Sequence, residues 1–268
     1  MSISDALNLV LVPTGLVIGH LAIAARIFRG GPTIEMGVRL LASGWAAALF
    51  LGWGLRAAAV ARLPMVGLSE SNLSMAVTTV VVSIIWEIHH KGRTIITPLS
   101  VLIAAALLSH GNRFAPALSE VVFTQGSLAI TVHTIFAWTA FGLFALANFL
   151  ALRLVLGHTE GDDLGPELRI ALRLALVVFS MTLITGFLTS PAIFGVPTHL
   201  DPIEALGLLI WSATGVLLIS EHRGKWPSKR LARWTLALFA LVVVTSQCLP
   251  YLPEGTTYHV FEPLSSQD

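Results

Sequence analysis

Histidine is the residue type in this chain whose placement could support chemistry. His133, His199 and His259 lie at the ends of apolar runs or between them, and Asp201 follows His199 by two residues. A neutral imidazole offers a lone pair to a metal, and two imidazoles on different helices are what a haem iron with two axial ligands needs. A single histidine at a membrane surface is also satisfied by water or lipid. The most specific prediction from the three together is a haem site at one membrane face.

His20 differs because it lies inside the first apolar run. An ionisable side chain at that depth is unfavourable in lipid and is often functional. It could ligate an inner haem, carry a proton or hydrogen-bond a neighbouring helix. His89, His90 and His222 fall at the opposite rim from the first three histidines, where they are candidate partners or contacts for lipid head groups.

The elements that must position these histidines are apolar stretches long enough for membrane-spanning helices. They cover residues 6–27, 38–60, 71–88, 94–109, 128–152, 170–187, 204–220 and 231–251. The fourth and seventh are short, and a buried or re-entrant helix is the alternative for each. The sequence therefore predicts an all-α, polytopic integral membrane protein with about eight transmembrane helices.

Lysine and arginine fall mainly on alternate connections between these stretches. Thirteen of the sixteen lie on one face: Arg26, Arg29, Arg39, Lys91, Arg93, Arg153, Arg169, Arg173, Arg223, Lys225, Lys229, Arg230 and Arg233. The other face has Arg56, Arg62 and Arg113. Because basic residues are retained in the cytoplasm, both termini are expected to be extracytoplasmic. His133, His199 and His259 then share the outer face.

Composition excludes a sizeable soluble domain, since 55% of the residues are hydrophobic and 12% are charged. We expect a single membrane domain over residues 1–268. Its expected partners include membrane lipid and do not include nucleic acid. The opening residues carry no basic segment, which favours a retained first span in a bacterial inner membrane over a cleaved signal or transit peptide. Cys248 excludes an internal disulfide and is expected to be a buried packing residue.

Two connections stand out by their composition. The segment 157–169 is polar, and Pro166 is expected in the first turn of the sixth helix. The segment 187–205 is expected to be irregular, because each of its prolines should stop a helix. These prolines are Pro191, Pro197 and Pro202.

Several segments, in this order, resemble the cytochrome c assembly proteins of the CcsA/ResC and HemX-like superfamily. A proline-containing loop running into a helix at 61–86, a histidine heading a long helix at 118–154 and the LDPIEA ending of 185–211 are similar to that family. So are the basic turn at 221–246 and the TTYHVF segment at 256–261. The resemblance covers about residues 60–261.

This resemblance implies a haem, of b type, held at the extracytoplasmic face by His133 and His259. It implies that the loop gripping the porphyrin edge includes Asp201, Pro202, Glu204 and the aromatic residues Phe187 and Phe194. The family has several tryptophans in this loop, whereas residues 187–203 have none. His222 lies one turn beyond the position of the family's inner histidine.

Three functions stay open at this stage. The chain could hand haem to apocytochrome c as a component of a haem lyase system, or hold haem permanently as an integral subunit of an electron-transfer complex. It could also be a haem-free membrane partner of the HemX-like kind. Nothing in the sequence indicates a kinase or hydrolase, since it has no glycine-rich phosphate loop and no base is expected near the serines at 69–74.

Overall fold

The apolar runs form α-helices throughout the described chain of the computed structural model, because lipid offers no hydrogen-bond partner to backbone N–H and C=O groups. The helices are α1 (Ile3–Ile27), α2 (Pro32–Val60), α3 (Gly67–His89), α4 (Ile96–Gly111), α5 (Leu128–Leu156), α6 (Gly165–Phe194), α7 (Pro202–Gly224) and α8 (Ser228–Val243). A π-helical turn, Val244–Cys248, continues α8.

The structure describes residues 3–27, 31–61, 63–64, 67–90, 96–113, 128–156, 164–195, 198, 201–224 and 226–249. Within these ranges the side chains of 3–8, 26–27, 32, 67–68 and 192–194 are not described. The described residues contain no strand, so the all-α prediction is confirmed for them.

In the described part of the chain, six helices are long and apolar enough to cross a membrane. They include α7, which spans 23 residues, so the prediction of a short seventh segment was wrong. Two shorter apolar segments, Leu9–Ala25 and Ile96–Gly111, accompany them. By length and composition the chain is a multi-pass α-helical membrane protein.

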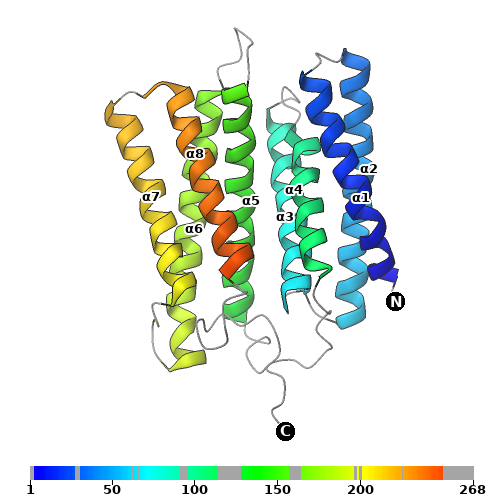
Figure 1. Ribbon diagram of the computed structural model, residues 1–268. Helices are drawn as coiled ribbons and strands as arrows, with labels where there is room; N and C mark the ends of the chain where they lie inside the picture. Colours follow the sequence, from blue (N-terminus) through cyan, green and yellow to red (C-terminus); the bar gives the residue numbers. More distant parts are fainter. Residues whose placement is uncertain are drawn as a thin grey trace. The chain divides into compact units, whose positions relative to one another are not determined.

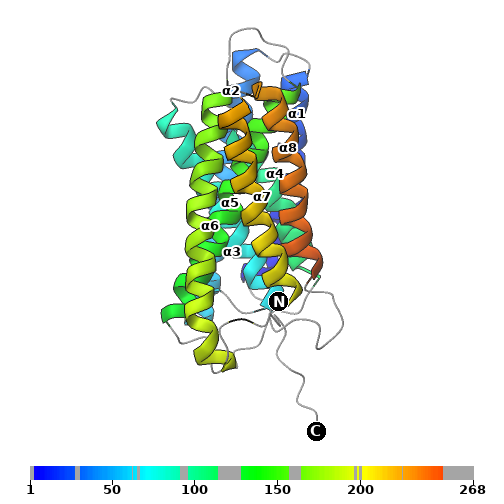
Figure 2. The ribbon, with the colours of Figure 1, turned by 90° about the vertical axis from the view of Figure 1, so that its left-hand side faces the viewer.

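The helices cluster into two units, each with its own packing. The first contains α1 to α4, in which α4 packs against α1 and α3, and α2 packs mainly against α1. The second contains α5 to α8, with α5 packed between α6 and α8 (Figures 1 and 2). Consecutive helices within each unit run in opposite directions, so each unit has two polar ends.

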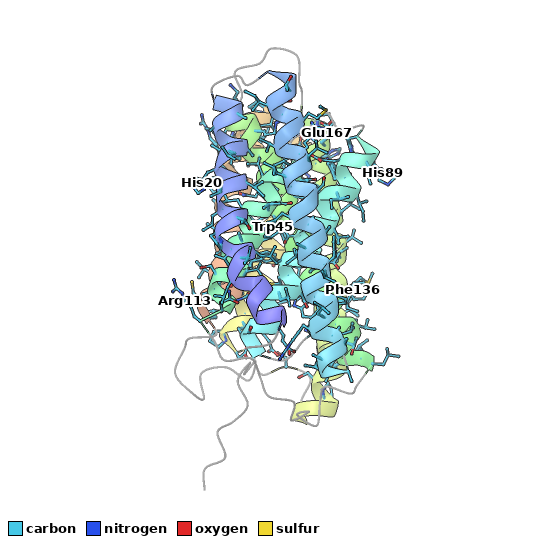
Figure 3. All side chains as sticks on the ribbon, turned by 90° about the vertical axis from the view of Figure 1, so that its right-hand side faces the viewer. His20, Trp45, His89, Arg113, Phe136 and Glu167 are labelled. Carbon is cyan, nitrogen blue, oxygen red and sulfur yellow. The ribbon has the colours of Figure 1, made fainter. Side chains whose placement is uncertain are left out.

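Close helix packing in the first unit depends on two glycines of α1. A Cβ atom at Gly15 would lie 2.8 Å from Ala105 Cβ and from the Trp45 ring, and one at Gly19 would lie 2.5 Å from Leu102 Cβ. Spacing by four residues places both glycines on one helix face, as in the small-residue packing motif of membrane helices. The Trp45 indole lies between helices and donates a 2.8 Å hydrogen bond to the Leu11 carbonyl (Figure 3).

Proline has different effects at the two ends of α6. Pro166 lies in its first turn, as predicted. Pro191 lies inside the helix, so the expectation that it stops α6 was wrong. The helix ends instead at Gly195, which has a positive φ of 76° and donates its N–H to the Pro191 carbonyl. A proline in the last turn disrupts few backbone hydrogen bonds because the helix ends one turn later.

The π-helical turn after α8 also overturns an expectation. Cys248 is exposed at the end of this turn, so the prediction that it is a buried packing residue was wrong. Burial of a small side chain depends on which face of the helix it occupies, and the π-helical turn changes that face.

Candidate functional site

His133 joins α5 to α6 at one end of the second unit. Its Nδ1 atom lies 3.0 Å from the Thr182 carbonyl oxygen and 3.3 Å from the Thr185 hydroxyl. That hydroxyl donates its own hydrogen to the Met181 carbonyl at 2.7 Å. Both neighbours therefore act as acceptors, so Nδ1 must carry the proton and donate to them.

This hydrogen bond fixes the tautomer of a neutral His133. With the proton on Nδ1, the lone pair lies on Nε2, which is then the nitrogen able to bind a metal. Histidines that ligate metals usually donate their other ring N–H to a carbonyl or carboxylate, which sets the ring orientation. The imidazole is half-buried. His133 thus has the protonation pattern of an axial ligand.

Gly186 allows the imidazole to lie directly against α6. A Cβ atom at this position would be 2.9 Å from His133 Cε1 and 3.2 Å from Nδ1. Any larger residue would push the ring away from the Thr182 carbonyl. Gly186 and Thr182 could not be identified from the sequence, because nothing in the spacing shows that residues about 50 positions apart face each other.

Phe187, the aromatic residue after Gly186, has a side chain that is 56% exposed. It therefore lies on the surface of the second unit, one residue after Gly186, which the imidazole contacts. An exposed aromatic ring offers a flat apolar surface for stacking. The side chain of Phe194 lies outside the described residues.

The first turn of α7 is capped by its own acidic residues. Asp201 is buried, and its Oδ1 accepts a 2.8 Å hydrogen bond from the Glu204 N–H. Glu204 in turn accepts a 2.6 Å hydrogen bond from the Thr198 hydroxyl. Carboxylates here satisfy helix N–H groups and complement the helix dipole. The predicted Asp201 and Glu204 therefore shape the start of α7, at the same end of the unit as His133.

The other predicted ligands are not brought to His133 by the described structure. His199 and His259 lie outside the described residues. His222 is exposed in the last turn of α7. It is 18 residues after Glu204, about 27 Å along a helix, so it lies at the opposite end of the second unit.

His20 belongs to the first unit and projects from the outer face of α1 (Figure 3). Its Nδ1 donates a 2.7 Å hydrogen bond to the Leu16 carbonyl of the same helix. Among the described residues, this bond stays within α1, and the three possible roles of His20 stay predictions. As in His133, donation from Nδ1 leaves the lone pair of the neutral ring on Nε2. The His20 ring is exposed.

Two buried ion pairs were not predicted from the sequence. Arg56 and Glu70 join α2 to α3 at 2.7 Å, with side chains 15% and 2% exposed. Arg169 and Glu221 join α6 to α7 at 2.7 Å. Each pair lies near a helix end, where an apolar run gives way to polar residues.

Polar side chains also connect α3 to α4. Glu87 accepts hydrogen bonds from the backbone N–H groups of Ile96 and Thr97 and from the Thr97 hydroxyl, at 2.6, 3.2 and 2.8 Å. At the other end of these helices, the fully buried Asn72 lies 3.3 Å from His110. The expectation that no base lies near the serine cluster was therefore wrong, because α4 brings His110 to it.

Within the described residues, no group of three or more histidine, cysteine or acidic side chains is arranged to hold a metal ion. The described helices define a multi-pass helical membrane protein, and in its second unit His133 of α5 donates a hydrogen bond to the α6 backbone. No protein-family model matches the chain, and no curated protein matches it.

Proposed function

We propose that this protein handles haem at the extracytoplasmic face of a bacterial inner membrane, as a component of cytochrome c assembly, with His133 as one axial ligand. The observation that carries the proposal is the hydrogen bond from His133 Nδ1 to the Thr182 carbonyl. It holds the ring in the orientation and tautomer that an axial ligand requires.

The residues around His133 fit a b-type haem in three respects. The imidazole Nε2 is the ligand nitrogen, Gly186 leaves room for the ring against α6, and the exposed Phe187 offers an apolar surface to a porphyrin. The second ligand in this proposal is His259, as the family resemblance implies. His199 lies on the same predicted face and is a further candidate for contact with the cofactor. In this proposal, the haem itself is the group that is passed to partner subunits or to apocytochrome c.

The proposed topology has eight crossings with both termini outside the cytoplasm. Charge supports it in the second unit. Among the described residues, the end opposite His133 carries Arg153, Arg169, Arg173, Arg223, Lys229, Arg230 and Arg233. The end with His133 carries no lysine or arginine in the described part of that unit and has Asp201 and Glu204. Basic residues stay on the cytoplasmic side, so His133 faces outward.

The experiment is a reduced-minus-oxidised absorbance spectrum of the detergent-purified protein, with haem quantified per chain. We expect a low-spin b-type signal in the wild type and its loss or conversion in His133→Ala, because one imidazole fewer leaves five-coordinate iron. His158→Ala is the matched control and should leave the spectrum unchanged, since His158 is predicted on the cytoplasmic side and belongs to none of the candidate sets. A colourless protein from haem-replete cells would favour the haem-free partner function.

A second variant separates ligand geometry from ligand loss. Gly186→Ala keeps His133 but places a Cβ 2.9 Å from its ring, so we expect a shifted haem spectrum and reduction potential. Gly207→Ala is the control, because a Cβ there meets nothing closer than 3.8 Å. Equal spectra for Gly186→Ala and wild type would contradict ligation by His133. A reporter fused after Asp268 tests the topology and should be active outside the cytoplasm.

A further inference from the structure

The turn from α7 into α8 concentrates exposed cations. Lys229, Arg230 and Arg233 are exposed in the first turn and a half of α8, and Arg223 is exposed at the end of α7. The first turn of α8 contains no acidic residue. In the described structure, Lys229, Arg233 and Arg223 form no ion pair. The carboxylate of the preceding turn, Glu221, is already paired with Arg169. Among the described residues, the positive charge of this surface is therefore not compensated.

Aromatic side chains border the cations. The Arg230 guanidinium lies 4.3 Å above the centre of the Trp226 ring, in a cation–π contact. Gly224 makes room for this indole, since a Cβ there would lie 2.8 Å from Trp226 Nε1. Trp234, one turn after Arg230, is 54% exposed. Tryptophan beside basic residues is typical of the level at which a membrane helix meets lipid head groups.

Below the cations, the exposed face of α8 becomes apolar and narrow. Ala237 and Ala240 follow Arg233 at spacings of four and three residues, so they continue the same face. Both alanines are exposed, and Val244 extends the face with 44% exposure. The exposed side chains that follow the positive charges along this face are therefore small and apolar.

We propose that this face of α8, formed by Lys229, Arg230, Arg233, Trp234, Ala237 and Ala240, binds an anionic phospholipid. The three cations contact the phosphate, the tryptophans lie at the level of the glycerol, and an acyl chain lies along the alanines. Charge complementarity selects an anionic head group. The apolar side chains below the cations favour a lipid over a soluble phosphate, because α8 together with its π-helical turn, Ser228–Cys248, is long and apolar enough to span the bilayer. The inference does not depend on haem binding.

Native mass spectrometry of the purified full-length chain in a neutral detergent tests this proposal. Phosphatidylglycerol, cardiolipin and phosphatidylcholine are titrated separately, and inorganic phosphate is added as a competitor. We expect the two anionic lipids to bind at least tenfold more tightly than phosphatidylcholine, with millimolar phosphate unable to displace them.

Two sets of variants complete the test. The triple substitution Lys229→Gln, Arg230→Gln, Arg233→Gln should reduce anionic-lipid affinity at least tenfold, because each cation contributes separately to phosphate binding. Ala237→Leu should reduce the affinity for lipids with long acyl chains several-fold and leave the affinity for a short-chain analogue unchanged.

Arg113→Gln removes an exposed cation of the first unit and should change nothing (Figure 3). Circular dichroism verifies that all variants fold, which is expected because the substituted side chains are exposed. Wild-type affinity in the triple variant, equal binding of phosphatidylcholine, or displacement of lipid by phosphate would each overturn the proposal.

Discussion

Replacing Arg56 with methionine removes the cation that faces a buried carboxylate. Arg56 Nη2 and Nε lie 2.7 and 2.9 Å from the same Glu70 oxygen, and the two side chains are 15% and 2% exposed. Breaking a pair buried to this degree costs about 3–5 kcal/mol, against about 0–1 kcal/mol for an exposed pair. Glu70 also lies in the first turn of α3, where the helix dipole stabilises a carboxylate by about 0.3–1 kcal/mol. We therefore expect Arg56→Met to lower the free energy of unfolding by about 3 kcal/mol.

The assay is reversible unfolding in mixed detergent micelles, followed by tryptophan fluorescence. A double-mutant cycle with Glu70→Met isolates the interaction between the two side chains. We expect the double variant to lie within about 1 kcal/mol of wild type, because well-packed apolar residues of similar size replace a buried ion pair at little cost. Arg113→Met is the control, since Arg113 is exposed at the end of α4 and its loss should change stability by less than about 0.5 kcal/mol.

Two results would refute this reasoning. If Arg56→Met lowers the free energy of unfolding by less than about 1 kcal/mol, the pair contributes no more than an exposed ion pair does, contrary to the burial of Glu70. Strict additivity of the two single substitutions in the double variant would mean that the carboxylate and the guanidinium do not stabilise each other.

Four further substitutions probe the packing within the two units. Gly19→Ala should destabilise by about 1–3 kcal/mol, since the new Cβ would lie 2.5 Å from a side-chain carbon of α4. Gly54→Ala, with nothing within 4 Å, should be neutral or slightly stabilising in the same unfolding assay. Glu87→Ala removes the acceptor for the first N–H groups of α4 and should cost about 1–2 kcal/mol; hydrogen exchange that is unchanged in that helix would count against this cap. Arg169→Met should lower the free energy of unfolding more than the double substitution Arg169→Met, Glu221→Met does. A larger loss in the double variant would exclude a stabilising ion pair.

The positions of the helices follow closely from the sequence. Eight apolar runs correspond to eight described α-helices, because the apolar character of a segment is a property of that segment alone and lipid leaves helices as the favoured structure. Pro166 was placed correctly in the first turn of α6 for the same local reason. The all-α class and the multi-pass membrane class were likewise predictable. The number of crossings, the placement of the termini and the haem ligation stay predictions.

Pairs of residues on different helices could not be predicted in the same way. His133 meets Thr182 across 49 residues, Arg169 meets Glu221 across 52, and Arg56 meets Glu70 across 14. Such pairs depend on the rotation and the vertical offset of each helix. In a soluble protein the apolar face of a helix indicates its rotation, but a membrane helix is apolar on its lipid-facing side as well.

The apolar runs and the positions of the charged residues by themselves determined that this chain forms membrane helices, which part of the chain each helix occupies, and which connections carry the basic residues. Only the tertiary structure decided that the helices divide into two units, that α6 continues through Pro191, and that the His133 imidazole donates to α6 over Gly186. The physical reason is that burial in lipid acts on each segment separately. Close packing and hydrogen bonding act between segments, where a shift of one helical turn changes every partner.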